Sequence, residues 1–179
     1  NADRPGVTPS ERSIYSNLDN IFQNAEQRLF ICTFASSLHR IQQFIDLAVK
    51  HRRLIAISGR SMIGNINTAT ELGYLDLPHD LLIDLKDAKR FEPNETMTLC
   101  TGSQGEPRSA MSLISRGDHT LLHIDSGDTV LISARQIPGN EREIRKMIGH
   151  ILRRGAHVIH EQNDHVHVSG HGAREDLKL

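Results

Sequence analysis

Apolar residues recur at helical spacing in five segments of the chain. The first segment begins at Thr8-Pro9-Ser10-Glu11, where Thr8 is expected to cap a helix and Glu11 to reach back to the cap backbone. The other four place apolar residues on one face over residues 38–49, 63–72, 107–115 and 144–152. The pattern therefore predicts five helices, of which the third ends at Gly73.

Short apolar runs rich in strand-forming residues separate or follow these helices. They cover residues 29–34, 54–57, 96–100, 119–124, 129–132, 156–160 and 165–169. The turn Asp125-Ser126-Gly127-Asp128 joins two of the runs and predicts a hairpin. Because most strands alternate with helices, the chain is expected to form right-handed βαβ units. The predicted fold is α/β: an open, mainly parallel twisted sheet with helices on both faces.

Length and charge narrow the possibilities. At 179 residues the chain is expected to form a single domain, residues 1–179, with a core that needs neither disulfides nor a structural metal. Both ends look like interior positions of a longer polypeptide. Lys and Arg number 21 against 22 Asp and Glu, a formal net charge of -1, so any binding of a polyanion must be local.

The cysteines and the hydropathy of the chain indicate in which cellular compartment the protein is expected. Cys32 and Cys100 each lie in an apolar run, where a thiol usually behaves as a small buried hydrophobe. No stretch is long and apolar enough for a membrane span, and no signal segment opens the sequence. We therefore expect a reduced, cytoplasmic setting without a membrane partner.

Three loops share a layout of strand, small-residue loop and helix: residues 101–105, 133–140 and 169–172. Loops at the carboxyl ends of parallel strands attract anions, since free backbone N–H groups and glycines allow close approach. Ser103, Ser133 and Ser169 would add hydroxyl donors. Each loop alone is explained as well by ordinary turn chemistry, but three together favour a phosphate site. None matches the P-loop or the dinucleotide fingerprint, so a nucleotide cofactor is not predicted.

Histidines concentrate at the third loop. His167 and His171 flank it, and imidazole beside backbone donors suits a phosphodiester. His165 is expected only to solvate an exposed face. The pair His165 and His167 has the two-residue step of some zinc sites, but no set of carboxylates or cysteines completes it, so no metal ligand is assigned in this chain.

Four charged residues in or near these segments have a structural or a functional explanation. Arg135 lies in the second loop and is expected to bind phosphate, whereas Arg142 and Arg145 have acidic neighbours on a solvated helix face. Glu11 is already explained by helix capping.

Five motifs in family order resemble the bacterial ribonuclease J family. They are Phe34-Ala35-Ser36-Ser37-Leu38-His39-Arg40-Ile41-Gln42-Gln43, Gly59-Arg60-Ser61-Met62, Cys100-Thr101-Gly102-Ser103-Gln104-Gly105-Glu106-Pro107, Ile137-Pro138-Gly139-Asn140-Glu141 and His167-Val168-Ser169-Gly170-His171. The resemblance spans essentially the whole chain. It identifies the chain as a Rossmann-like β-CASP domain, which in that family is inserted into a metallo-β-lactamase domain.

This resemblance implies a ribonuclease with 5′-to-3′ exonuclease and endonuclease activity in RNA maturation and decay. In the family, two zinc ions activate the attacking water. This chain lacks the His-rich metal motif, so it should hold no cofactor, and the zinc ions are expected in the flanking metallo-β-lactamase domain of the full-length enzyme. The chain alone is expected to be inactive.

The resemblance also assigns roles to individual residues. Glu11 and His171 match the general-acid pair of the wider superfamily, in which the histidine protonates the leaving oxygen. Four further residues match the pocket for RNA phosphate, including the 5′-monophosphate: His167, Ser169, Gly170 and Ser133. Arg135 departs from the small residue of many relatives, which implies either extra phosphate affinity or a shifted pocket.

The predicted partners are RNA with a 5′-monophosphate end and the chain's own metallo-β-lactamase domain, and the full-length protein is expected to be a homo-oligomer. An alternative hypothesis is a self-contained α/β module or enzyme that binds phosphate, a nucleotide or another small molecule and does not act on RNA.

Overall fold

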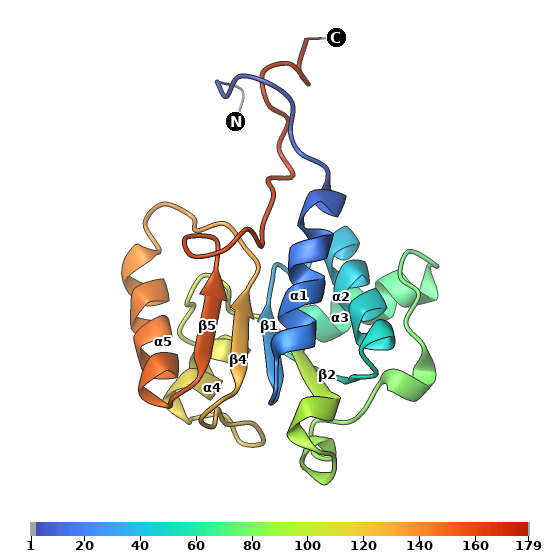
Figure 1. Ribbon diagram of the computed structural model, residues 1–179, viewed down its shortest axis with the longest axis vertical. Coiled ribbons are helices and arrows are strands. Elements are labelled where there is room, and N and C mark those ends of the chain that lie inside the picture. Colours follow the sequence, from blue (N-terminus) through green and yellow to red (C-terminus); the bar gives the residue numbers. More distant parts are fainter. Residues whose placement is uncertain (1–2, 179) are drawn as a thin grey trace.

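The computed structural model describes residues 3–178 and contains a five-stranded parallel sheet in the order β2-β3-β1-β4-β5 (Figure 1). The strands are β1 (Leu29–Cys32), β2 (Leu54–Ser58), β3 (Thr96–Cys100), β4 (Thr129–Ile132) and β5 (His157–His160). The α-helices are α1 (Tyr15–Asn24), α2 (Leu38–Lys50), α3 (Arg60–Glu71), α4 (Ala110–Arg116) and α5 (Glu141–Arg153). Short 3₁₀ helices cover Glu11–Ile14, His79–Leu81, Ala88–Arg90 and Pro93–Glu95. The prediction of an open α/β sheet is confirmed.

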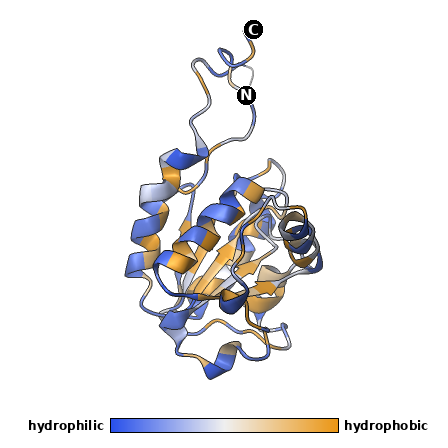
Figure 2. Ribbon diagram, turned by 90° about the vertical axis from the view of Figure 1, so that its right-hand side faces the viewer, coloured by the Kyte–Doolittle hydropathy of each residue, from blue (hydrophilic) through white to orange (hydrophobic). Residues whose placement is uncertain are grey.

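Helices cover both faces of the sheet, which explains why its strands are almost continuously apolar. Leu29 and Ile31 of β1 pack with α1, α2 and α3, whereas Phe30 and Cys32 pack with α4 and α5. Figure 2 shows the hydrophobic strands between helices whose outer surfaces are hydrophilic. Successive side chains of each strand therefore contribute to two cores, one on each face.

The predicted hairpin between residues 119–124 and 129–132 is wrong. Residues 119–124 form no strand, and β4 pairs in parallel with β1 and β5. The buried carboxylate of Asp128 accepts the backbone N–H of Asp125 at 2.8 Å and Nε of Arg28 at 3.1 Å. These bonds tie the turn to the residue that precedes β1, so β4 starts beside β1 in the same direction.

Residues 165–169 were expected to be a strand, and they are not one. The predicted alternation of exposed and buried side chains is still present, because Val166 and Val168 are buried. Side chains take the place of a neighbouring strand: Asn17 Nδ2 donates to the His165 carbonyl at 2.9 Å, and Ser133 Oγ donates to the Val166 carbonyl at 2.6 Å. An alternating pattern shows which side chains are buried, but it does not show whether a neighbouring strand is present to accept and donate the backbone hydrogen bonds of a sheet.

The start of the first helix also differs from the prediction. Ser10, not Thr8, is the N-cap, and its hydroxyl accepts from the Arg12 N–H at 3.2 Å. Thr8 instead joins the two ends of the chain, since its hydroxyl donates to the His171 carbonyl and accepts from the Ala173 N–H, both at 2.9 Å. The capping role predicted for Glu11 is wrong, because the backbone N–H of Thr8 donates to Asp176 and the Glu11 carboxylate binds Arg40. Two helix starts shift as well: α3 begins at Arg60, and α4 begins at Ala110 after the N-cap Ser109.

The cysteines are buried, as predicted. Cys32 and Cys100 face each other in the β1–β3 register with 3.3 Å between their sulfur atoms. Burial raises the pKa of the Cys32 thiol, which disfavours the reactive thiolate. None of the helices within residues 3–178 has the length and apolar character needed to cross a membrane.

Candidate functional site

The candidate site lies where the chain changes sides of the sheet. β1 and β4 are neighbours, but α2 follows β1 onto one face and α5 follows β4 onto the other. Such a switch point leaves a crevice at the carboxyl ends of the strands, where ligands of α/β proteins usually bind. A pocket of about 700 Å³ lies there, lined by Arg4, Pro5, Val7, Thr8, Pro9, Arg135, Glu161, Asp164, His165, His167, Val168, Ser169 and Ala173. We call it the His167 pocket.

A buried arginine organises the wall of this pocket. Arg40, on the first turn of α2, is 1% exposed. Its guanidinium binds both carboxylate oxygens of Glu11, at 2.6 and 3.1 Å, and donates to the carbonyls of Ser133 at 3.1 Å and Val168 at 3.0 Å. It also donates to Nδ1 of His167. We refer to these five residues as the Arg40 cluster.

The cluster joins three distant parts of the chain: the N-terminal 3₁₀ helix, the end of β4 and the segment that follows β5. A buried guanidinium is tolerated only when its charge is paired and its N–H groups are bonded, and Glu11 with the two carbonyls meets both conditions. Sequence reasoning assigned Arg40 no role. One feature of the sequence could have indicated that Arg40 is buried: it lies one helical turn before Phe44, on the apolar face of the same predicted helix.

His167 is held neutral and in one tautomer. An arginine can only donate, so Nδ1 of His167 carries the lone pair and the ring proton lies on Nε2. Burial, and then the charges of Arg40 and Arg135, lower the pKa of His167 to about 4. At neutral pH the ring therefore presents an N–H donor without carrying a charge.

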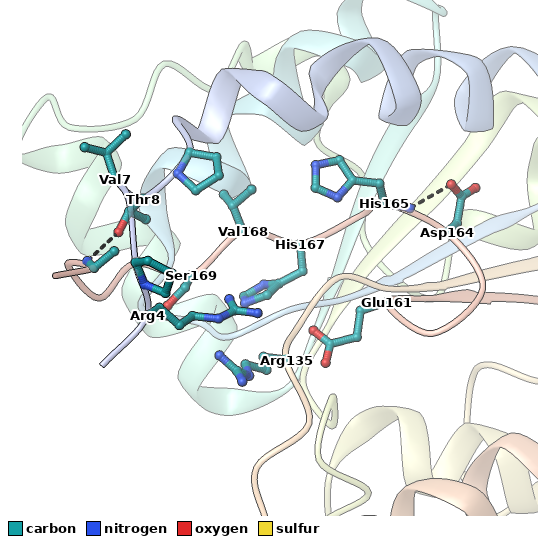
Figure 3. A pocket seen from close by; sticks show the side chains of 13 residues that line it. Arg4, Val7, Thr8, Arg135, Glu161, Asp164, His165, His167, Val168 and Ser169 are labelled. Atoms are coloured by element: carbon teal, nitrogen blue, oxygen red, sulfur yellow. Dashed lines mark hydrogen bonds between the residues drawn. The ribbon is translucent and has the colours of Figure 1, made fainter. Parts of the chain in front are cut away.

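Cationic side chains complete this wall. Figure 3 shows Arg4 and Arg135 reaching toward the His167 ring, with Glu161 beyond Arg135. Arg135, a predicted phosphate ligand, thus lies in the same pocket as His167. Arg4 was not predicted, because it lies outside the loops and motifs to which the sequence assigned ligands.

The loop that carries Arg135 is fixed by a buried glutamine. Gln104 Nε2 donates to the Arg135 carbonyl, and Gln104 Oε1 accepts from the Ile137 N–H, both at 2.9 Å. The neighbouring Ser103 was the predicted phosphate ligand in this motif. It is buried and lines a separate small cavity with Ile144 and His160, outside the His167 pocket. The side chain of this motif that contacts the second loop is therefore Gln104.

The predicted serines occupy different positions. Ser133 is completely buried and its hydroxyl donates to the Val166 carbonyl, so here it supports the wall from behind. Ser169 lines the pocket, and its hydroxyl accepts from the His171 N–H at 3.2 Å. At Gly170 a Cβ would meet nothing within 4 Å, which leaves the backbone next to Ser169 open to a ligand.

Glu11 and His171, the two predicted catalytic residues, do not line the His167 pocket. Glu11 lines another hollow, together with His39, Gln42 and Tyr74, and reaches His167 only through Arg40. His171 is exposed in the tail that Thr8 holds, one residue beyond Gly170.

Metal-ligand chemistry is not assembled in the described part of the chain. Within residues 3–178 no three His, Cys, Asp or Glu side chains are placed to share an ion. The donor set of these residues therefore does not fit the two zinc ions, which the resemblance assigns to the flanking metallo-β-lactamase domain.

Comparison with known proteins identifies the family. Residues 26–151, well over half of the chain, match the family described as Ribonuclease J, beta-CASP domain. Over 179 residues the chain is 45% identical to Ribonuclease J of Synechocystis sp., 42% to that of Thermus thermophilus and 38% to that of Helicobacter pylori. It covers 28%, 31% and 26% of these proteins, so it spans about a quarter to a third of their length. The chain therefore belongs to the β-CASP domain family of ribonuclease J.

Proposed function

We propose that this domain binds the sugar-phosphate backbone of RNA as part of a zinc-dependent ribonuclease J. In this proposal the His167 pocket receives a phosphate group of the substrate, including the 5′-monophosphate of an RNA end. The two zinc ions belong to a metallo-β-lactamase domain outside this chain, so the chain alone does not cleave RNA.

The observation that carries the proposal is the state of His167. Its neutral ring directs Nε2–H away from Arg40, in a pocket that also contains Arg4, Arg135 and Ser169. Two guanidinium groups supply positive charge, while the imidazole adds a directed donor whose protonation does not change near neutral pH. This combination suits a phosphate oxygen better than a carbon skeleton or a metal ion.

The catalytic step assigned to this domain is a proton transfer. As the P–O bond breaks, His171 gives its proton to the leaving oxygen, and Glu11 acts through the Arg40 cluster as a positioning residue. The proposed full-length enzyme works in the cytoplasm as a homo-oligomer, with both 5′-to-3′ exonuclease and endonuclease activity. The family match favours this function over the alternative, a self-contained small-molecule module.

Binding measurements on a full-length ribonuclease J that contains this domain test the pocket. We expect His167→Ala to weaken binding of a 5′-monophosphorylated RNA by about 10- to 100-fold, the value of one hydrogen bond to a charged group. His167→Gln should recover most of the affinity, because an amide can accept from Arg40 and still donate to phosphate.

His157→Ala is the matched control, since it removes an exposed imidazole at the start of β5, at the end of the strand opposite to the pocket. Fluorescence anisotropy at constant salt gives the three affinities. If His167→Ala binds as tightly as His157→Ala, the pocket does not hold RNA phosphate and the proposal fails.

The lowered pKa of His167 also predicts how stability depends on pH. Between pH 6.5 and about 4 the unfolded chain protonates this histidine and the folded chain does not, so the unfolded state binds more protons. The contribution of His167 to stability is therefore present above pH 6.5 and is lost as the pH falls toward 4. Urea unfolding across this range should show a shallower pH dependence for His167→Gln than for the parent. Parallel curves would mean that His167 is not held neutral.

A further inference from the structure

A second hollow lies at the carboxyl ends of β2 and β3 and shares no lining residue with the His167 pocket. It has a volume of about 990 Å³. Its walls are the β2–α3 turn, residues 106–110 before and at the start of α4, and residues 119–121. We call it the β2–β3 groove. Three residues of the motif Gly59-Arg60-Ser61-Met62 line it, Gly59, Arg60 and Ser61, and the proposed function gives this motif no role.

The groove carries unpaired positive charge. Arg60 and Arg108 line it, both are exposed, and neither guanidinium has a hydrogen-bond or ion-pair partner among residues 3–178. The one carboxylate in the lining, Glu106, accepts the N–H of Gln104 at 3.2 Å. In a chain with a formal net charge of -1, two free guanidinium groups at one opening form a local site for an anion.

The start of α3 points backbone donors at the same place. α3 begins at Arg60 without a side-chain cap, so the N–H groups of its first turn have no partner within the helix. Gly59 lets the start of α3 lie close to the loop that follows β3. Its φ is +108°, and a Cβ at this position would lie 2.4 Å from Oγ1 of Thr101 in that loop. Any other residue would push the start of α3 away from the end of β3.

A buried donor without an acceptor lies at the base of the groove. Nδ1 of His119 accepts the N–H groups of Leu121 and Leu122 at 3.2 and 3.1 Å, so its proton is on Nε2, which donates to Ser58 Oγ at 3.2 Å. Burial lowers the pKa of His119, which favours this neutral form. Ser58 is only 2% exposed, and its own hydroxyl proton has no acceptor among residues 3–178. A ligand oxygen would supply one.

The remaining wall of the groove is apolar. Ile63 and Leu121 are 41% and 39% exposed, and with Leu85 they continue into an adjoining hollow that contains Phe91. A ligand that fits has an anionic group at one end and a flat, weakly polar group at the other. A nucleotide has this form.

We propose that the β2–β3 groove is a second nucleotide-binding site, with the phosphate at Arg60, Arg108 and the start of α3 and the base against Leu121 and Ile63. The nucleotide comes either from an RNA strand that also occupies the His167 pocket or from free mononucleotide. The first source depends on the proposed function, and the second does not.

The test compares two double variants in full-length ribonuclease J containing this domain. Arg60→Ala/Arg108→Ala removes the charge of the groove, and Arg142→Ala/Arg145→Ala removes the same charge from the exposed face of α5. The probes are a phosphorothioate-linked oligouridylate, which keeps the phosphate charge but resists cleavage, and UMP. All four substituted residues are exposed, so the fold should be retained.

We expect the groove variant to bind the oligouridylate about tenfold more weakly than the control variant. The slope of log affinity against log salt should fall by about 0.7 for each phosphate that the groove no longer neutralises. If UMP binding weakens as well, the site takes free nucleotide; if only the oligouridylate is affected, it takes a nucleotide of the strand. Equal affinities and slopes for the two variants with both probes would overturn the proposal.

The outcome is separable from that of the proposed function. If His167→Ala leaves oligouridylate binding unchanged while the groove variant weakens it, the groove stands and the His167 pocket does not. If only His167→Ala weakens oligouridylate binding, the His167 pocket stands and the groove does not.

Discussion

Replacement of Arg40 by methionine is expected to lower the free energy of unfolding by about 3 kcal/mol, the lower end of the range for breaking a buried ion pair. Methionine keeps much of the side-chain length but leaves the Glu11 carboxylate and the Val168 carbonyl without their donor. The Ser133 carbonyl loses one of two donors and keeps the Thr33 hydroxyl at 3.0 Å. The Glu11 side chain is 27% exposed and water reaches it in part, so the upper end of the range is not expected. Urea unfolding of the chain measures the change.

A double-mutant cycle identifies the cause. If the unpaired carboxylate dominates, Glu11→Gln combined with Arg40→Met should cost less than the sum of the two single changes. Arg145→Met, an exposed change on α5, should stay within about 0.5 kcal/mol of the parent. A loss for Arg40→Met no larger than that of Arg145→Met would show that the Arg40 cluster does not hold the tail in place.

Replacement of His171 by alanine in full-length ribonuclease J is expected to lower the single-turnover cleavage rate by about 10²- to 10⁴-fold, the usual contribution of a general acid. RNA affinity should change far less, because the contact strengthens only as the leaving oxygen gains charge. Rates and affinities are measured at saturating zinc on the same RNA.

His157→Ala provides the matched control, since this imidazole is exposed at the start of β5, away from the pocket, and has no role in the proposal. It should keep nearly the parent rate. Equal losses of rate and affinity in His171→Ala would make His171 a positioning residue for RNA and leave the proton donor to be found elsewhere.

Local patterns predicted the sheet well but not every partner within it. The runs at residues 29–34, 54–57, 96–100, 129–132 and 156–160 all contain strands, because a strand buried on both faces must be apolar throughout. The hairpin failed for a different reason. The turn residues 125–128 allow a reversal, but the buried Asp128 binds Arg28, which is 100 residues away, and a local pattern contains no information about that contact.

The sequence named residues of one pocket but not the contacts that join them. His167, Ser169 and Arg135, which were assigned from their loops or motif, line the same pocket, and their role as phosphate ligands stays a prediction. Ser103 lies elsewhere, and Ser133 supports the wall. Loop chemistry shows that a donor is near the carboxyl edge of the sheet, but packing decides whether the donor faces ligand or protein.

The amino-acid sequence alone determined the α/β class, the buried faces, the family motifs and the side chains that carry imidazole and guanidinium groups to one edge of the sheet. Only the folded chain decided that Arg40 joins Glu11 to His167, that Nε2 of His167 bears the proton, and that Arg60 and Arg108 share a groove. The reason is physical: periodicity and motif are properties of neighbours along the chain. The tautomer of a histidine, the pairing of a buried charge and the lining of a cavity depend on residues that only tertiary packing brings within hydrogen-bond distance.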